Sequence, residues 1–422
     1  MPNIARAGSL EFTIMSLFTW LDYSERERRK MLDVVDFFRE KETRDELGLA
    51  SVRDSFADQL FPGTSTIQTR ARYFLLVAWT YQALEGKRIG STPISERARR
   101  AETALIEAIE HSDDKEGNIG KYARSALKRL PSSVYWQGLG VWGIRAFQGS
   151  LAQYHRSFER HHSRRELHLA RKSERDEEHD DLLPPNWHGG LPKPPDGFPE
   201  ACSLRLSSGD ADYLRERIQL GPGCRGSLLA ELVSTPLHVP DLDFIWNHPN
   251  QKAYSLEHQK LLEHARNFSE LMHGAALLYN LILSEECKND ELISEYTGLL
   301  EEWSDVMSSR KTPFAKWNRE EFWEQVAVGN PRIKEPTKRF IKNWWDLVLE
   351  NPSTSMISLS AARQLITARE SQIKPKNLVR IGNPRAREAW SGKSGSDQMD
   401  FRWKSARRIL TDIFDGLEAD DA

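Results

Sequence analysis

Residues 255–286 read SLEHQKLLEHARNFSELMHGAALLYNLILSEE and carry the clearest long helical pattern in the chain. Apolar side chains recur there at the three- and four-residue spacing of an α-helix and form one broad face. They are Leu261, Leu262, Ala265, Phe268, Leu271, Met272, Ala275, Leu278, Tyr279 and Ile282. A face of this width is typical of a helix in a bundle core. We therefore predict a mainly α-helical, multidomain protein with a C-terminal helical bundle.

The same spacing predicts helices on both sides of this stretch. On the N-terminal side they are expected after the capping-box residues Ser24–Glu27, after residues 61–66, and over residues 95–111, 119–130, 210–217 and 227–233. On the C-terminal side they are expected over residues 336–349, 359–371 and 401–417. Strand-like alternation is scarce, and the absence of an internal repeat argues against a solenoid.

Residues 173–200 contain six prolines and three glycines. Such a composition sustains neither a helix nor a central strand, because proline lacks an N–H donor and fixes φ. We predict a linker over residues 173–200, between an N-terminal domain (residues 15–172) and a C-terminal domain (residues 201–422). The patterned sequence begins near Met15, so residues 1–14 are interpreted as an extension.

The composition excludes several classes of protein. The chain has 422 residues, of which 29% are charged, and no apolar run approaches the ~18 residues of a membrane span. The three cysteines, Cys202, Cys224 and Cys287, are too widely spaced to indicate a disulfide framework or a cysteine zinc site. No secretory signal is recognisable at the N-terminus. We expect a cytoplasmic protein without membrane association.

Two basic blocks stand out against a net charge of −3. Residues 118–172 hold eleven Lys and Arg against two Glu, and residues 374–408 hold ten against three acidic residues. The first block surrounds the aromatic, glycine-rich segment 131–142, and such interleaving is typical of surfaces that meet a phosphate backbone. Two interpretations stay open: a winged helix-turn-helix-like element that flanks a duplex, or a buried tryptophan-rich turn with a solvated basic face.

Short motifs give no firm sign of a cofactor. Gly138, Gly140 and Gly143 match the GxGxxG spacing, but the sequence around them lacks the βαβ unit of about 30 residues that a dinucleotide site requires. Residues 61–66 offer hydroxyls for a phosphate at a helix N-terminus, although ordinary capping explains them more simply. Residues 390–395 read WSGKSG and suit either an anion-binding nest or a flexible turn.

Histidines crowd residues 155–188, where six occur. Imidazole is a good zinc ligand, but the interleaved arginines would repel a dication and no carboxylate or cysteine falls at a closed-site spacing. Glu270 and His273 form an ExxH step without a second copy, so a di-iron bundle is not indicated. We predict neither a metal nor another cofactor.

Several stretches together carry a resemblance to a known family. They are residues 16–24, residues 60–66 with Arg70 and Arg72, residues 131–136 through 142–144, and residues 274–280, 390–392 and 401–403. The chain resembles an uncharacterised bacterial family, classed as a domain of unknown function, whose genes lie beside helicase and phospholipase-D-like nuclease genes in anti-phage clusters. The resemblance implies a cytoplasmic component of a defence module that acts on or near DNA. It implies no catalytic residue.

We therefore expect a non-enzymatic, nucleic-acid-binding subunit that helps a helicase or nuclease partner to recognise invading DNA. The expected contact residues are Arg70, Arg72, Lys121, Arg124, Lys128, Arg129, Trp136, Trp142, Arg145, Arg385, Arg387 and Lys393. One alternative is a metal-dependent nuclease or phosphate-processing hydrolase, in which Asp54 and Asp58 converge with Arg70, Arg72 or Ser391. Another is an assembly scaffold whose basic faces meet an acidic partner such as residues 285–305 of a second copy.

Overall fold

The structure, a computed structural model, describes residues 45–87, 93–158, 185–235, 240–351 and 356–419. In these ranges the chain is mainly α-helical and has no β-strand, and an isolated bridge joins Arg145 and Trp187. The predicted fold class is confirmed. The helix expected after Ser24 and most of the histidine-rich stretch lie outside the described residues.

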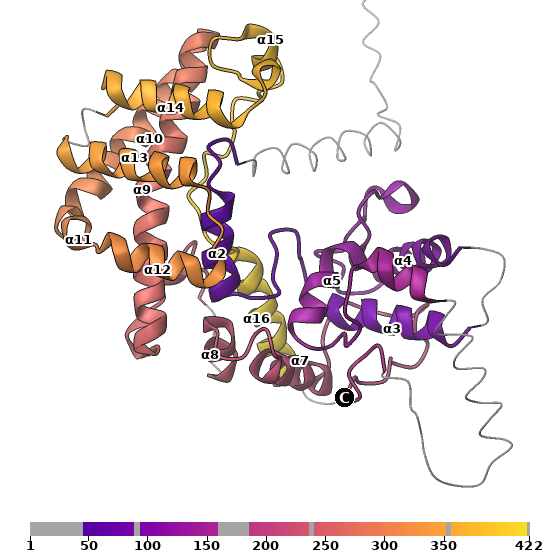
Figure 1. Ribbon diagram of the computed structural model, residues 1–422. Helices are drawn as coiled ribbons and strands as arrows, with labels where there is room; N and C mark the ends of the chain where they lie inside the picture. Colours follow the sequence, from indigo (N-terminus) through magenta and orange to yellow (C-terminus); the bar gives the residue numbers. More distant parts are fainter. Residues whose placement is uncertain (1–44, 88–92, 159–184, 236–239, 352–355, 420–422) are drawn as a thin grey trace, which may run out of the picture.

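An N-terminal lobe consists of α3 (Tyr73–Glu85), α4 (Ile94–Glu110) and α5 (Pro131–Val141) (Figure 1). Helix α3 reads YFLLVAWTYQALE and is buried on almost every side, because α4, α5 and the coil after residue 185 cover it. The predicted helix over residues 95–111 corresponds to α4. Between α4 and α5, residues 119–130 form one short 3-10 turn, η1 (Arg124–Ala126), where a longer helix was predicted.

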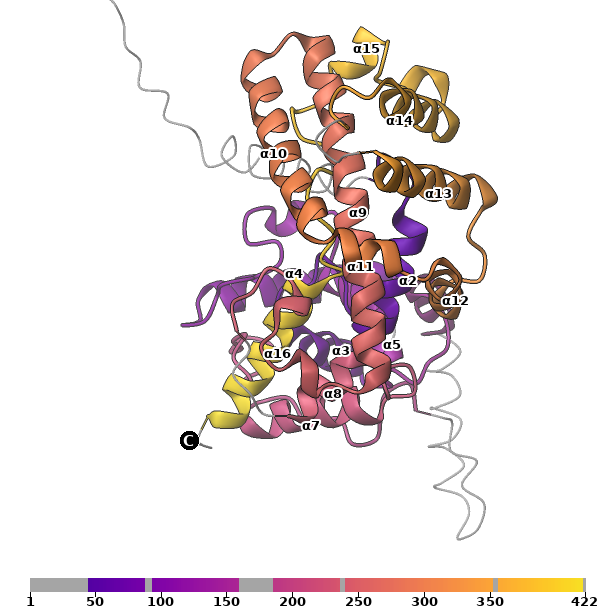
Figure 2. The ribbon, with the colours of Figure 1, turned by 90° about the vertical axis from the view of Figure 1, so that its left-hand side faces the viewer.

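The helical bundle is built on α9 (Leu256–Cys287), against which α10 (Asp290–Ser309), α13 (Glu335–Glu350) and α14 (Ser360–Ile373) pack (Figure 2). Helix α9 ends at Lys288, whose left-handed backbone reverses the chain, and the Asn289 side chain caps α10. The bundle predicted from residues 255–286 is confirmed. Two further helices, α11 (Lys311–Lys316) and α12 (Arg319–Gly329), connect α10 to α13.

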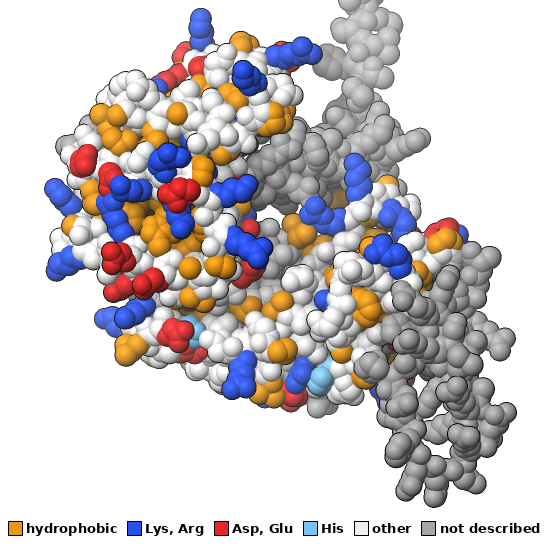
Figure 3. Space-filling view, in the orientation of Figure 1, with side chains coloured by type: hydrophobic (Ala, Val, Ile, Leu, Met, Phe, Trp, Pro, Cys, Tyr) orange, Lys and Arg blue, Asp and Glu red, His pale blue; other side chains and the backbone are white. Residues whose placement is uncertain are grey.

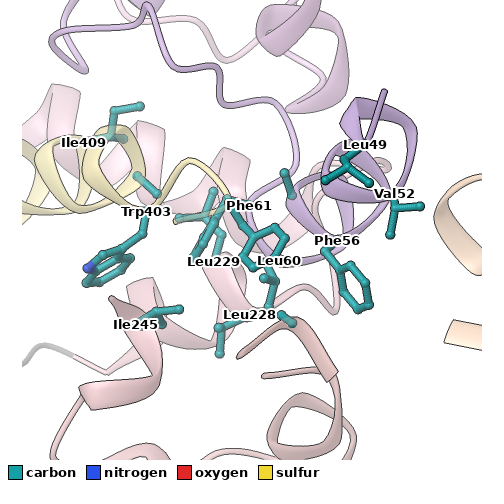
Figure 4. Packing of buried hydrophobic residues seen from close by; sticks show 14 of the residues in the cluster. Leu49, Val52, Phe56, Leu60, Phe61, Leu228, Leu229, Ile245, Trp403 and Ile409 are labelled. Carbon is teal, nitrogen blue, oxygen red and sulfur yellow. The ribbon is translucent and has the colours of Figure 1, made fainter. Parts of the chain in front are cut away.

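A second set of helices joins the bundle to the N-terminal lobe. These are α2 (Ala50–Leu60), α7 (Ser208–Leu220), α8 (Leu228–Ser234) and α16 (Trp403–Glu418). Figure 4 shows Phe61, which follows α2, in the buried core between Trp403 and the rest of α2, with Phe56 further along α2. The rings of Phe61 and Trp403 lie 5.7 Å apart between centroids. The last helix of the chain therefore packs against the first described one.

Five short elements complete the described chain. They are η2 (Ile245–Asn247), η3 (Gln251–Ala253), η5 (Lys376–Leu378), α15 (Pro384–Arg387) and a helical segment over residues 151–158.

The proline-rich coil that follows residue 185 packs on α3. Trp79 donates from Nε1 to the Pro192 carbonyl at 2.7 Å, and its ring meets Phe198 edge-on at 5.6 Å. This part of the predicted linker thus covers the N-terminal lobe. The domain boundaries themselves stay a prediction.

The first two glycines of the GxGxxG segment are helical, whereas Gly143 follows α5 in a turn with φ +69°. Gly138 and Gly140 lie inside α5, which begins with Pro131 at a position where the missing N–H costs nothing. A Cβ on Gly138 would lie 2.3 Å from the Gly63 carbonyl oxygen, so glycine is needed there for close packing. These glycines serve helix packing, and the turn expected over residues 131–142 is replaced by α5.

Candidate nucleic-acid interface

Arg70 is buried where the N-terminal lobe meets α16. Its Nε donates to both carboxylate oxygens of Asp412, at 2.9 and 3.0 Å, and its Nη atoms donate to Asp114 at 2.8 and 2.6 Å. Burial alone would lower the Arg70 pKa, but the two carboxylates outweigh it and raise the pKa. A guanidinium enclosed by two carboxylates binds within the protein and offers no phosphate contact.

Arg72 and Arg145 are buried as well. Arg72 forms an ion pair with Asp210, and its guanidinium lies 5.1 Å from the centre of the Trp79 ring. Arg145 stacks on Trp136 at 4.5 Å and donates to the carbonyls of Trp136 and Gly149 at 3.3 and 3.2 Å. Its pKa is lowered by burial. Both side chains hold neighbouring segments together.

The two tryptophans expected to stack on bases lie in the core. Trp142 is fully buried, stacks on Phe74 with ring centroids 3.9 Å apart, and donates from Nε1 to the Pro62 carbonyl at 3.0 Å. Trp136 is 6% exposed, and its Nε1 donates to the Gly149 carbonyl at 3.0 Å. Segment 131–142 therefore matches the buried, tryptophan-rich alternative, although as a helix.

The second basic block is largely matched by acidic side chains. Arg387 pairs with Glu286, and Lys393 lies 2.8 Å from Asp397. The same holds for Lys374 and Arg380 with Glu46, Arg402 with Asp58, Arg407 with Asp241, and Arg408 with Asp412. Arg385 is exposed on α15. The cations of this block mainly form ion pairs that join segments of the protein, and few of them present unpaired positive charge to the solvent.

Apart from Arg385 and Lys393, the predicted basic residues that stay at the surface lie on one loop, residues 118–130, which we call the basic loop. Arg124, Lys128 and Arg129 are exposed, and Lys121 is half-buried with its Nζ 3.8 Å from Glu110. Tyr122 is 44% exposed, and its ring centre lies 5.7 Å from the Lys121 ammonium. In the described part of the chain, Arg124 and Lys128 have no acidic partner.

Hydrogen bonds with α4 fix the basic loop. Arg99 of α4 donates from Nη2 to the carbonyls of Ser125 and Leu127, at 2.9 and 2.7 Å. Asn118 donates to the Ile106 carbonyl at 3.0 Å, and Gly120 adopts φ +84° beside Leu127. Figure 3 shows Lys and Arg side chains gathered over this end of the N-terminal lobe. The loop presents its cations in a defined arrangement.

A strap of residues 390–400 lies along α9. His273 Nε2 bonds to the Ser396 carbonyl at 3.0 Å, Ser269 donates to the Met399 carbonyl at 2.7 Å, and Asn280 donates to the Ser394 carbonyl at 3.0 Å. The ExxH step of Glu270 and His273 thus has a structural role. The Glu270 carboxylate accepts a hydrogen bond from Arg266 Nε at 2.8 Å, and the Glu270 backbone oxygen accepts one from Trp303 Nε1.

A cavity of about 540 Å³ lies between α2, α9 and the strap. No sequence motif indicated it, because its walls come from four separate segments near residues 45–57, 65–66, 272–279 and 394–405. Only tertiary packing brings them together.

Residues expected for phosphate or metal chemistry lie apart. Helix α3 begins at Tyr73, so the hydroxyls of residues 61–66 do not cap it, and Thr64 donates to the Phe61 carbonyl at 2.6 Å. Asp58 and Asp54 lie 2.6 and 3.6 Å from Arg402, whereas Arg70 pairs with Asp412. Ser391 donates to the Lys393 carbonyl. The convergence required by the hydrolase alternative is not found among these residues.

The described residues contain neither a metal-binding cluster nor a membrane-spanning helix. No group of three or more His, Cys, Asp or Glu side chains there is arranged to hold a metal ion. Within the same ranges, no helix has the length and apolar character needed to cross a bilayer.

Comparison with known proteins gives one match. A family model described as "Family of unknown function (DUF6361)" matches residues 15–417 of the chain. Neither a curated protein nor a solved structure matches it.

Proposed function

The chain belongs to DUF6361, a family of unknown function, and we propose that this member binds nucleic acid through the basic loop without catalysing a reaction itself. One observation carries the proposal: Arg124 and Lys128 are exposed on a fixed loop and lack an acidic partner among the described residues. Cations of this kind bind phosphates by releasing condensed counterions. The exposed Tyr122 ring beside them suits an unpaired base.

The contact set is narrower than the twelve residues expected from the sequence. It consists of Lys121, Arg124, Lys128 and Arg129, with Tyr122. The buried arginines and tryptophans support the lobe that carries the loop, and we leave the second basic block out of the proposed interface because its cations are mostly paired.

Binding should be measured by fluorescence anisotropy with duplex and single-stranded DNA and RNA across a salt series. On duplex DNA each phosphate contact contributes about 0.9 log unit of affinity per log unit of salt. The variant Arg124→Gln/Lys128→Gln should therefore lower the slope by up to about 1.8. The matched control is Lys376→Gln/Arg385→Gln, which removes two exposed charges from the second block and should leave binding unchanged.

Three results would reject the proposal. They are a salt-independent affinity, equal affinity of wild type and Arg124→Gln/Lys128→Gln, and an equal loss in the control. Incubation of labelled nucleic acid with the protein and Mg²⁺ or Mn²⁺ tests the hydrolase alternative in the same samples, since cleavage would contradict a purely binding role.

We further propose that binding serves a helicase or nuclease partner in anti-phage defence in the cytoplasm. This part rests on the family resemblance given above. Co-purification with the products of neighbouring genes after nuclease treatment tests it, because a complex bridged only by DNA would dissociate.

A further inference from the structure

The cavity between α2, α9 and the strap holds polar groups that the protein itself does not use. The Ser65 hydroxyl is buried and has no hydrogen-bond partner in the part of the chain that the structure describes. The Gln398 side chain lines the cavity without a partner among the described residues. A buried polar group that lacks a partner costs about 1–3 kcal/mol, so such groups usually serve a ligand or an ordered water.

His273 adds a third group. Its Nε2 faces the Ser396 carbonyl, which only accepts, so the proton must lie on Nε2. Burial lowers the His273 pKa and keeps the ring neutral. Its Nδ1 is then an acceptor, and no second partner is present among the described residues. The cavity therefore offers the amide of Gln398 on the strap, as donor and acceptor, and the Nδ1 acceptor of His273 on α9.

Acidic residues outnumber basic ones around the cavity. Asp45, Glu46, Asp54, Asp397 and Asp400 line it, against Arg53, Arg402 and Lys404. Several of these charges are already paired, as Arg402 is with Asp58 at 2.6 Å and Asp397 with Lys393 at 2.8 Å. Glu46 is paired as well, with Lys374 and Arg380, so the charges around the cavity are nearly balanced and favour neither an anion nor a cation. An uncharged ligand is favoured.

The remaining walls are apolar and include a strained backbone. Leu49, Ala57 and Met272 border the cavity but are almost fully buried, and Ala276 contributes accessible apolar surface. Phe401 and Arg402 adopt φ values of +52° and +72°, an uncommon conformation for residues other than glycine. Consecutive residues of this kind are often found where a loop is held to shape a binding site.

We propose that this cavity binds an uncharged molecule of nucleoside size, with a flat apolar body and a hydrogen-bonding edge. The flat body would lie against Ala276 on α9. Its edge would meet His273 and Gln398. A volume of about 540 Å³ lies within the usual range of about 300–1,000 Å³ for small-molecule sites. The site is independent of the basic loop.

Isothermal titration calorimetry of the whole chain with adenosine, guanosine, cytidine and uridine tests the proposal, with their 5′-monophosphates as a charged series. At least one nucleoside should bind saturably, and its monophosphate should bind at least tenfold more weakly. Ala276→Phe fills the cavity from α9 and should abolish binding. The matched control is Ala361→Phe on the exposed face of α14, which should bind like wild type.

Gln398→Ala removes a ligand contact without removing a bond within the protein, so it should weaken binding about tenfold with unchanged thermal unfolding of the free protein. The variant Arg124→Gln/Lys128→Gln should bind nucleosides like wild type, which separates this site from the basic loop. The proposal is overturned if no nucleoside binds, if Ala276→Phe binds normally, or if monophosphates bind as well as nucleosides.

Discussion

Asp412 of α16 accepts hydrogen bonds from Arg70 Nε at 2.9 Å and from the Ala71 amide at 2.8 Å. The carboxylate thus neutralises a buried guanidinium and also satisfies a backbone donor just before α3. Arg70 and Asp412 are 6% and 3% exposed at their side chains, so solvent cannot replace either partner.

Asp412→Ala should destabilise the protein by about 3–5 kcal/mol, because it leaves a buried guanidinium with one of its two carboxylates. Urea unfolding followed by circular dichroism measures the change. The control is Asp397→Ala, which breaks an exposed pair with Lys393 and should cost about 0–1 kcal/mol. A cost below about 1 kcal/mol for Asp412→Ala would show that Asp114 alone stabilises Arg70.

Glu102 should give the protein a pH-dependent stability. Burial raises the pKa of this fully buried carboxyl to about 7, while hydrogen bonds from Ser132 oppose the shift. The folded protein therefore keeps a proton that the unfolded chain, with a value near 4.5, loses at lower pH. Stability should fall as pH rises from 4.5 to 7, at up to about 1.4 kcal/mol per pH unit.

Glu102→Gln removes this titration and can still accept from the Ser132 amide. The free energy of unfolding of wild type minus that of the variant should decrease between pH 5 and pH 8. Urea titrations at four pH values in this range provide the test, and parallel pH profiles would contradict the assignment to Glu102.

Two glycines of the α9–α10 hairpin should respond in opposite ways to alanine. A Cβ on Gly274 would lie 2.3 Å from the Trp303 indole, so Gly274→Ala should destabilise by about 1–3 kcal/mol. A Cβ on Gly298 would meet no atom within 4 Å, so Gly298→Ala in α10 should stabilise by about 0.5–1 kcal/mol. Thermal unfolding distinguishes the two, and a shared sign would refute the packing argument.

Trp136→Phe should lower stability without changing the affinity of the folded protein for nucleic acid. Its indole donates to the Gly149 carbonyl and lies under the Arg145 guanidinium, so it supports the lobe and not the interface. Anisotropy titrations below the unfolding transition provide the measurement. A loss of affinity like that expected for Arg124→Gln/Lys128→Gln would instead indicate that Trp136 contacts nucleic acid.

The sequence predicted helices best where apolar spacing is regular. Residues 255–286 correspond to α9 almost exactly as expected, and residues 401–417 correspond to α16. The turn predicted over residues 131–142 was wrong, because the glycines that suggested it lie in a helix. Their actual role is close packing, as at Gly138 against the Gly63 carbonyl, and that contact spans 75 residues of sequence that no local pattern connects.

The residues of the candidate interface could be predicted less well from the sequence. A count of Lys and Arg does not show which of them meet carboxylates in space, and Arg70 finds its partner 342 residues away. Arg124 and Lys128 differ from Arg70 and Arg72 only in their tertiary surroundings. The cavity beside His273 could not be predicted at all, because its polar groups come from three distant segments.

The distance between Arg70 and Asp412 along the chain also bears on synthesis in the cell. A ribosome that adds about 5–20 residues per second needs about 20–70 s to make the 342 residues between them. During that interval the newly made lobe carries an arginine whose α16 partner has not yet been translated. The lobe is therefore expected to mature only after translation ends, and chaperones have a defined period in which to act on it.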